Sequence, residues 1–70
     1  MSALRKRVSK NLKRIRKEQM TQEEFAEKLD VSVRYIQKVE ASTFPNMKLD
    51  TLEEIARVLK VDILELFKRR

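Results

Sequence analysis

Residues 21–40 read TQEEFAEKLDVSVRYIQKVE, and this stretch decides the fold. It holds two short segments with helical spacing of apolar residues, separated by about three residues. Thr21 and Glu24 have the spacing of a capping box, which marks the start of a helix, and Ser32 has the side chain of an N-cap for the next one. Asp30 stands where the chain must turn. The stretch therefore predicts two helices joined by a tight turn, the helix-turn-helix motif.

The short connection makes demands on particular side chains, because the two helices must cross steeply and at close range. Ala26 supplies the small side chain that such an approach needs, and Ile36 is expected to fill the joint from the second helix. Asp30 tolerates the left-handed backbone conformation better than most residues, which matters in a chain without glycine. These three residues are the predicted packing residues of the motif.

The segments outside the motif also have helical spacing. Apolar residues within 4–15 predict a basic helix that ends near residue 17 or 19, with Leu4 at the start of its stripe. A second stripe, which includes Leu49, predicts a helix over about 48–59, and a possible capping-box pair at 62 and 65 opens a short last helix. No strand-like alternation and no internal repeat is visible. We expect an all-α, compact five-helix domain spanning residues 1–70.

Composition narrows the function classes. The chain has 17 basic and 11 acidic residues, a net charge of +6, and neither cysteine nor histidine. A basic surplus favours a polyanionic partner, either nucleic acid or an anionic membrane. Without cysteine, histidine or a glycine-rich phosphate loop there is no evident reaction centre, so we expect no enzyme, no cofactor and no metal site. No apolar run is long enough for a membrane span or a secretory signal, so a cytoplasmic protein is expected.

Charge is also unevenly distributed along the chain. The first predicted helix carries eight basic residues and no acid before Glu18. Five of the eleven acidic residues lie toward the other end of the chain, between Asp50 and Glu65. One face of the folded chain is therefore expected to meet phosphates while the other stays in water.

The motif sequence resembles the helix-turn-helix of the phage repressor and Cro family, the XRE-like bacterial regulators. Residues 49–67, LDTLEEIARVLKVDILELF, resemble the two helices that complete that domain, so the resemblance runs from about Val8 to Phe67. It implies a lambda-repressor-like fold and a sequence-specific regulator that binds double-stranded DNA. The chain departs from the family pattern in having Asp30 at a usual glycine, a shorter first connection, and Ala41 after the second motif helix. The features that carry the resemblance are Gln22, Ala26, Val31 with Ser32, Ile36, Glu40, Leu49, Leu52, Ala56 and Leu59.

The resemblance also implies roles for residues of the second motif helix. Val33, Arg34 and Lys38 match positions that face base edges in the major groove, and Gln37 lies beside them. The chemistry of these side chains fits independently: arginine bonds guanine bidentately, glutamine pairs with adenine, and an apolar side chain packs on the thymine methyl group. The docking angle of the helix decides which of these side chains meets which base.

Contacts to DNA phosphates are expected from Gln22, which matches a family residue at the start of the first motif helix, and from Lys13. The main expected role of Ser32 is that of an N-cap, and a phosphate contact is an additional one. Tyr35 either hydrogen-bonds a phosphate or packs through its ring, and both alternatives stay open. In relatives an arginine at the place of Arg16 pairs with the acid at the place of Glu40, so a structural salt bridge between these two is predicted.

Three kinds of partner remain possible. The leading hypothesis is a homodimer on a palindromic operator, of the repressor or restriction-modification controller type, without a small-molecule ligand. Its dimer seam is expected at Ile63, Leu66 and Phe67. The alternative is an antitoxin or other protein-interaction module, to which the same residues and Phe44 would offer an apolar patch. A membrane-binding first helix is disfavoured because its apolar stripe lacks Trp and Phe anchors.

Overall fold

The structure is a computed structural model that describes residues 3–41 and 47–69. Within these ranges the chain is helical, which confirms the all-α class. The elements are α1 (Ala3–Gln19), α2 (Gln22–Leu29), α3 (Val33–Glu40), α4 (Leu49–Leu59) and η1 (Ile63–Leu66). The prediction of five α-helices is wrong, because the described residues contain four and the last element is a single 3-10 turn. Four residues are too few to close a series of i to i−4 bonds, so the tighter turn forms instead.

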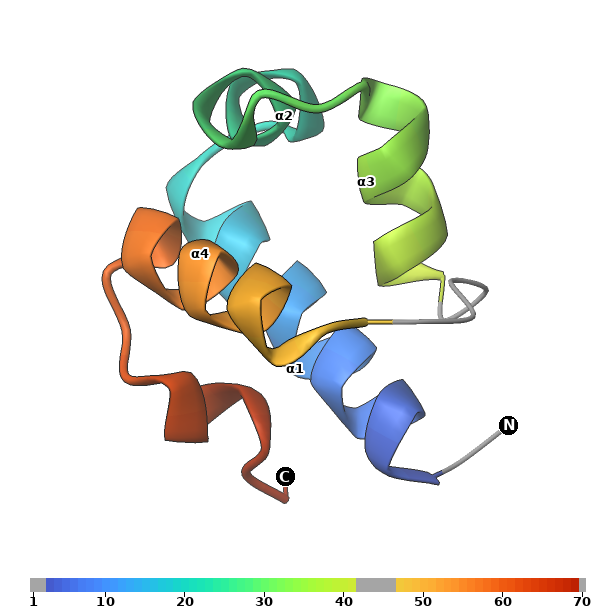
Figure 1. Ribbon diagram of the computed structural model, residues 1–70, viewed down its shortest axis with the longest axis vertical. Coiled ribbons are helices and arrows are strands. Elements are labelled where there is room, and N and C mark those ends of the chain that lie inside the picture. The colour runs from blue at the N-terminus through green and yellow to red at the C-terminus, as the bar shows by residue number, and fades with distance from the viewer. Residues whose placement is uncertain (1–2, 42–46, 70) are drawn as a thin grey trace.

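The helices share one apolar core, since none of their stripes is wide enough to be buried alone. Figure 1 shows α1 running diagonally behind α4, with α2 and α3 meeting at a steep angle above them and η1 below α4. The core lies between these elements. Its buried apolar residues are Val8, Leu12, Ile15, Phe25, Ala26, Ile36, Val39, Leu52, Ile55, Ala56, Leu59 and Leu66.

Side chains of α1 also bond the carboxyl-terminal ends of the other elements. Ser9 Oγ donates to the carbonyl of Val39 at 2.7 Å, near the end of α3. Gln19 Nε2 donates to the carbonyl of Leu59 at 2.7 Å, at the end of α4. The buried Asn11 Nδ2 donates to the carbonyls of residues 66 and 68, at 3.0 and 2.8 Å, and fastens the segment around η1. The last carbonyls of a helix lack intrahelical partners, so α1 supplies donors where the fold needs them.

Two turns of the chain have the same construction. After α2, Asp30 is left-handed at φ 59° and Val31 N–H donates to the carbonyl of Ala26 at 2.9 Å. After α4, Lys60 is left-handed at φ 59° and Val61 N–H donates to the carbonyl of Ala56 at 3.0 Å. Both are Schellman motifs, in which an N–H two residues past the helix returns to its last turn.

The likeness of these two turns extends to the helix starts that come after them. Ser32 caps α3 through Tyr35 N–H, and Asp62 caps η1 through Leu64 N–H. The segments α2–α3 and α4–η1 thus use one pattern twice, offset by thirty residues, contrary to the expectation of no repeat. The shared positions are Ala26 and Ala56, Leu29 and Leu59, Val31 and Val61, Ser32 and Asp62, and Ile36 and Leu66.

Two members of the predicted apolar stripes are not buried. Leu4 is 48% exposed near the start of α1, and Leu49 is 64% exposed at the first position of α4. Each stands at the first turn of its helix, where no neighbouring element covers it. No helix among the described residues has the length and apolar character to cross a membrane.

Candidate nucleic-acid interface

The helix α3 is held on the molecule by one face and open on the other. Ile36 and Val39 are each 1% exposed and pack against the core. The joint between α2 and α3 is closed by Ala26, which is buried, and by the left-handed Asp30. The three predicted packing residues therefore lie where the motif needs them, and the orientation of α3 is set by the core.

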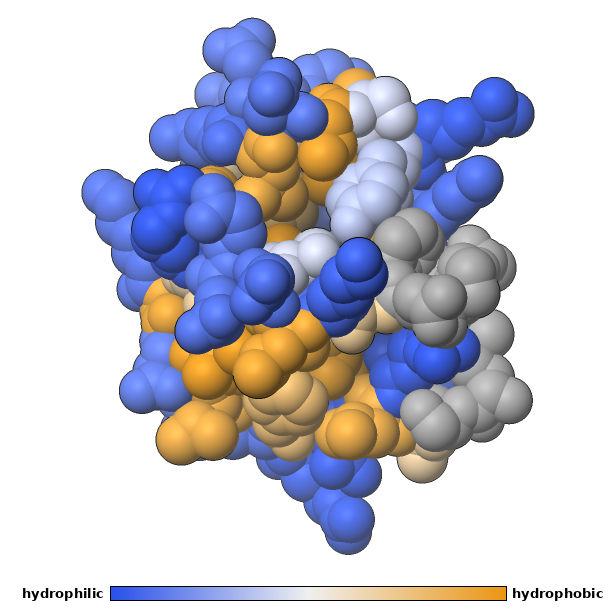
Figure 2. Space-filling view, viewed as in Figure 1, coloured by the Kyte–Doolittle hydropathy of each residue, from blue (hydrophilic) through white to orange (hydrophobic). Residues whose placement is uncertain are grey.

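The exposed face of α3 carries the side chains predicted to read bases. Arg34, Gln37 and Lys38 are all exposed, and Figure 2 shows hydrophilic side chains projecting outward in the region of α3. Spacings of three and four residues place them on one side of the helix. Val33 is half-buried and packs against the core, so its side chain reaches outward less than the other three.

A buried network fixes the carboxyl-terminal end of α3. Arg16 donates to the Glu40 carboxylate twice, from Nε to Oε2 at 2.8 Å and from Nη2 to Oε1 at 2.9 Å. The predicted salt bridge is thus present, and both side chains are buried, at 8% and 3% exposure. Gln22 Nε2 adds a third bond to Glu40 Oε1 at 3.0 Å. Residues of α1, α2 and α3 therefore meet at one carboxylate.

This network bears on the predicted role of Gln22. Its side-chain amide already donates one N–H to Glu40. An amide nitrogen carries two donors, so a second N–H remains for a phosphate. The phosphate contact of Gln22 stays a prediction, and the structure adds a bracing role that the sequence did not indicate.

Ser32 and Tyr35 form the amino-terminal end of α3. Ser32 Oγ accepts from Tyr35 N–H at 3.1 Å, so the N-cap prediction is confirmed. The side chain of Tyr35 is half-buried and packs against the core, lining a hollow with Leu29, Val31 and Asp50. This packing favours a structural role for the ring.

The capping box at the start of α2 is also present. Thr21 Oγ1 accepts from Glu24 N–H at 3.1 Å, and Thr21 N–H donates to Glu24 Oε1 at 2.8 Å. Hydrogen bonds from Thr21 hold the pKa of Glu24 below its ordinary value. The bond from the Thr21 backbone has the largest effect, and the bond from its side chain comes second. The carboxylate therefore remains ionised in the cap.

Next to this network α1 forms one wall of a basic groove. The groove is lined by the α1 residues Lys10, Lys13, Arg14, Lys17 and Glu18, and by Glu40 of α3. Lys13, a predicted phosphate ligand, is exposed there. The side of α3 and the cations of α1 thus belong to one surface.

This surface is the expected arrangement of a DNA-binding helix-turn-helix domain. The model of the Cro/C1-type helix-turn-helix family matches residues 12–66, which is most of the chain. The chain belongs to this helix-turn-helix family. Its members' shared activity gives the coarse function, that of a DNA-binding regulator. No curated protein and no solved structure matches the chain.

The predicted dimer seam of this helix-turn-helix protein needs one correction. Leu66 is 0% exposed and belongs to the core, so it is not available to a second chain. Ile63 and Phe67 are half-buried. Leu64, which sequence reasoning left out, is 64% exposed. The register of η1 explains why Leu66 is buried and Leu64 is exposed, because Leu66 occupies the inward position that Ile36 has in α3. Phe44 lies outside the described residues.

Other features of the site had weak signals in the sequence. The αL turn at Lys60 was missed because lysine has no preference for that conformation. The carbonyl bonds of Ser9, Asn11 and Gln19 were missed because they join residues far apart in the chain. Ser9 and Asn11 are polar residues on the buried side of α1, and this was the feature of the sequence that could have indicated such bonds.

Proposed function

We propose that this chain is a transcriptional regulator that recognises a two-fold symmetric operator as a homodimer, with α3 in the major groove. The observation that carries the proposal is the exposed row of Arg34, Gln37 and Lys38 on a helix whose other face is fixed in the core. The major groove is wide enough for an α-helix, and its base edges present the acceptors and donors that these side chains match.

Arg34 has the leading role in base reading. It lies in the first turn of α3, where recognition helices contact bases. Its guanidinium offers the fork of donors that pairs with O6 and N7 of guanine. Gln37 is placed to pair with adenine, and Lys38 lies one turn beyond Arg34. Val33 contributes through van der Waals contact with a thymine methyl group.

Phosphate contacts orient α3 in the groove. Ser32 and the free N–H groups of the first turn of α3 favour an anion, as helix amino termini do. Gln22 contributes its second amide hydrogen, Lys13 a charge, and Tyr35 its hydroxyl group. Contacts of this kind set register and orientation, and the bases supply the specificity.

The homodimer is supported by an apolar surface on the side of α4 and η1. Figure 2 shows hydrophobic atoms gathered over the lower part of the molecule, in the region of η1 and the start of α4. The exposed or half-buried apolar residues of this region are Leu4, Met47, Leu49, Ile63, Leu64 and Phe67. Two copies joined there would present two α3 helices to half-sites about 34–36 Å apart.

Selection of bound duplexes from a random DNA library at near-physiological salt tests the proposal. We expect a two-fold symmetric consensus with half-sites one helical turn apart. Arg34→Ala should relax the preference at one base pair of each half-site, with a loss of about 1–3 kcal/mol. Lys28→Ala, on the exposed end of α2, is the control and should leave the consensus unchanged. A consensus that Arg34→Ala does not alter would refute the assignment of α3.

A second candidate is a protein-interaction module, and the same apolar surface favours it. Leu64→Glu separates the two candidates, because Leu64 is exposed and its replacement does not disturb the core. For a homodimer, equilibrium sedimentation should show the wild type as dimers and Leu64→Glu as monomers with weakened operator binding. A wild type that stays monomeric and selects no consensus would favour the protein-interaction module.

Repression is the simplest mechanism, because it needs no contact other than the one between the dimer and its operator. A dimer bound over a promoter excludes polymerase without any further contact. In the proposed mechanism the concentration of the chain controls the occupancy of the operator, as in restriction-modification controllers.

A further inference from the structure

The helix α1 carries more basic residues than its contacts within the fold require. Residues 3–19 hold eight basic residues and one acid, so the remaining residues hold nine basic and ten acidic ones. The net charge of the protein thus resides on one helix. Like charges three and four residues apart destabilise a helix by about 0.2–0.5 kcal/mol per pair, so this clustering has a cost that folding does not explain.

Four of these cations line the groove beside α3. Lys10, Lys13 and Lys17 are exposed, Arg14 is half-buried, and none of the four has an ion pair with a described residue. They follow one another along about 10 Å of helix. Along one DNA strand, phosphates follow one another at about 3.4 Å of axial rise. With α1 along the duplex axis, the groove wall would span about three phosphates of one strand.

The acids of the groove do not cancel this charge. Glu40 is neutralised by two bonds from Arg16, and its side chain is 3% exposed. Glu18 is exposed at one end of the groove and offsets one of the four cations. A surplus of about three charges is left facing an anion.

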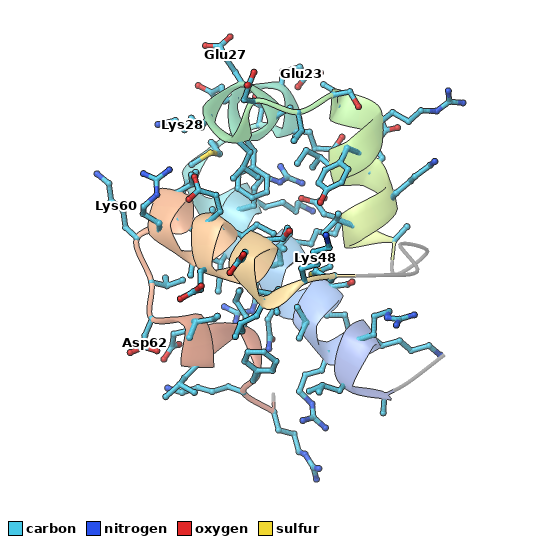
Figure 3. All side chains as sticks on the ribbon, in the orientation of Figure 1. Glu23, Glu27, Lys28, Lys48, Lys60 and Asp62 are labelled. Atoms are coloured by element: carbon cyan, nitrogen blue, oxygen red, sulfur yellow. The ribbon has the colours of Figure 1, made fainter. Side chains whose placement is uncertain are left out.

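A second basic hollow provides a comparison. Lys28, Arg57 and Lys60 line it, but Arg57 is paired with Glu54. Figure 3 shows Lys28 and Lys60 on the side of the molecule away from α3. The α1 groove, in contrast, shares Glu40 with α3 and so adjoins the helix that enters the DNA groove.

We propose that the groove lined by Lys10, Lys13, Arg14 and Lys17 is a separate binding site for the phosphate backbone of duplex DNA, next to the major groove that α3 enters. The inference rests on the proposed function, because α3 brings the duplex to the groove. The site reads no bases. It sets the affinity for any duplex and lets the protein hold DNA while it searches for an operator.

The test is the salt dependence of binding for the variant Lys10→Gln, Lys13→Gln, Lys17→Gln. Its matched control, Lys28→Gln, Lys60→Asn, Arg69→Gln, removes the same number of charges elsewhere. Each phosphate contact contributes about 0.9 to the slope of log affinity against log salt, so the groove variant should lower the slope by about 2–3 units. It should do so equally on the selected operator and on an unrelated duplex, and the control should change neither slope.

Base preference and phosphate ethylation interference complete the experiment. The groove variant should keep the wild-type consensus, which also shows that it is folded, and should lose interference at about three adjacent phosphates. A slope equal to that of the control variant, or an unchanged interference pattern, would overturn the inference. If the wild type selected no operator, the proposed function would fail, while the slopes on unrelated duplexes would still decide whether the groove binds DNA.

Discussion

At the scale of single residues, Glu40 connects the core to the interface. Its carboxylate accepts three bonds, two from Arg16 and one from Gln22, in a place where its side chain is almost fully buried. A buried ion pair contributes little compared with a well-packed apolar pair, but a charge left without its partner is costly. The pair therefore fixes the position of α3 more than it adds stability.

This argument predicts a strong asymmetry among variants. Glu40→Ala or Arg16→Ala should each lose about 3–5 kcal/mol of unfolding free energy, because the remaining partner is buried and uncompensated. The double variant Arg16→Met, Glu40→Met should lose much less. Urea denaturation of the four proteins checks this. If the double variant lost as much as the two single ones together, the two residues would act independently, and the argument from an uncompensated buried charge would fail.

Lys60 supports a second prediction at this scale. Its left-handed backbone at φ 59° costs a residue with a Cβ about 1–2 kcal/mol, a cost that glycine avoids. Lys60→Gly should therefore raise the melting temperature by about 4–8 °C. Lys28→Gly, within α2, should lower it instead, because glycine weakens a helix interior by about 1 kcal/mol. A lower melting temperature for Lys60→Gly would contradict the role of this turn.

At the scale of elements, each helix depends on the groups that close its ends. The described helices α2 and α3 begin at side-chain caps, and the ends of α3 and α4 are bonded by α1. Segments of eight residues are too short to be stable helices by themselves, so caps and tertiary contacts supply their stability. The last element shows the limit of this rule, since four residues form only a 3-10 turn even with a cap.

The capping box makes the stability of α2 sensitive to acid. The pKa of Glu24 is lowered in the folded protein, so its contribution is complete above the ordinary value of about 4.3 and is lost as the pH falls through the lowered pKa. Thr21→Ala removes the cap and should lower the melting temperature at pH 7 by about 5 °C.

The difference between Glu24→Gln and the wild type should shrink below about pH 4, since the Thr21 N–H then no longer meets a charged carboxylate in either protein. Melting curves between pH 3 and pH 7, followed by circular dichroism, measure this difference. A gap that stays constant over the whole range would show that the bond from Thr21 to the Glu24 carboxylate contributes nothing.

At the scale of the whole molecule, charge and helix direction are organised together. The carboxyl-terminal ends of α3 and α4 meet side chains of α1, the helix that carries the net positive charge. Helix carboxyl termini carry partial negative charge, so this arrangement is favourable. The repulsion among the cations of α1 is the opposing effect, and DNA is the partner that relieves it.

Added salt should relieve the same repulsion in the absence of DNA. Raising NaCl from about 50 mM to about 500 mM shortens the Debye length to a few Å, so the melting temperature of the free protein should rise by a few degrees. The groove variant with three lysines replaced should gain less. A melting temperature that falls with salt would mean that attractive surface pairs outweigh the repulsion on α1.

The sequence by itself determined the four α-helices and most of their ends, but not the 3-10 turn η1 or the left-handed turn at Lys60. Helical spacing of apolar residues, the pair Thr21 and Glu24, and Ser32 were sufficient to predict α2, the turn and α3, because caps and amphipathic spacing are local properties. The family pattern gave the partner of Arg16. Most of the candidate interface followed from the register of α3. Once Ile36 and Val39 face the core, helical geometry places Arg34, Gln37 and Lys38 on the exposed side.

The tertiary structure decided the features that depend on contacts between distant segments. It buried Leu66 and exposed Leu64, because the packing of η1 on α1 selects which side of a short turn faces inward. It joined Gln22 to Glu40, bonded Asn11 to the chain beyond η1, and placed the α1 cations beside α3. None of these can be read from local spacing, since each requires the crossing of helices that only the shared core fixes.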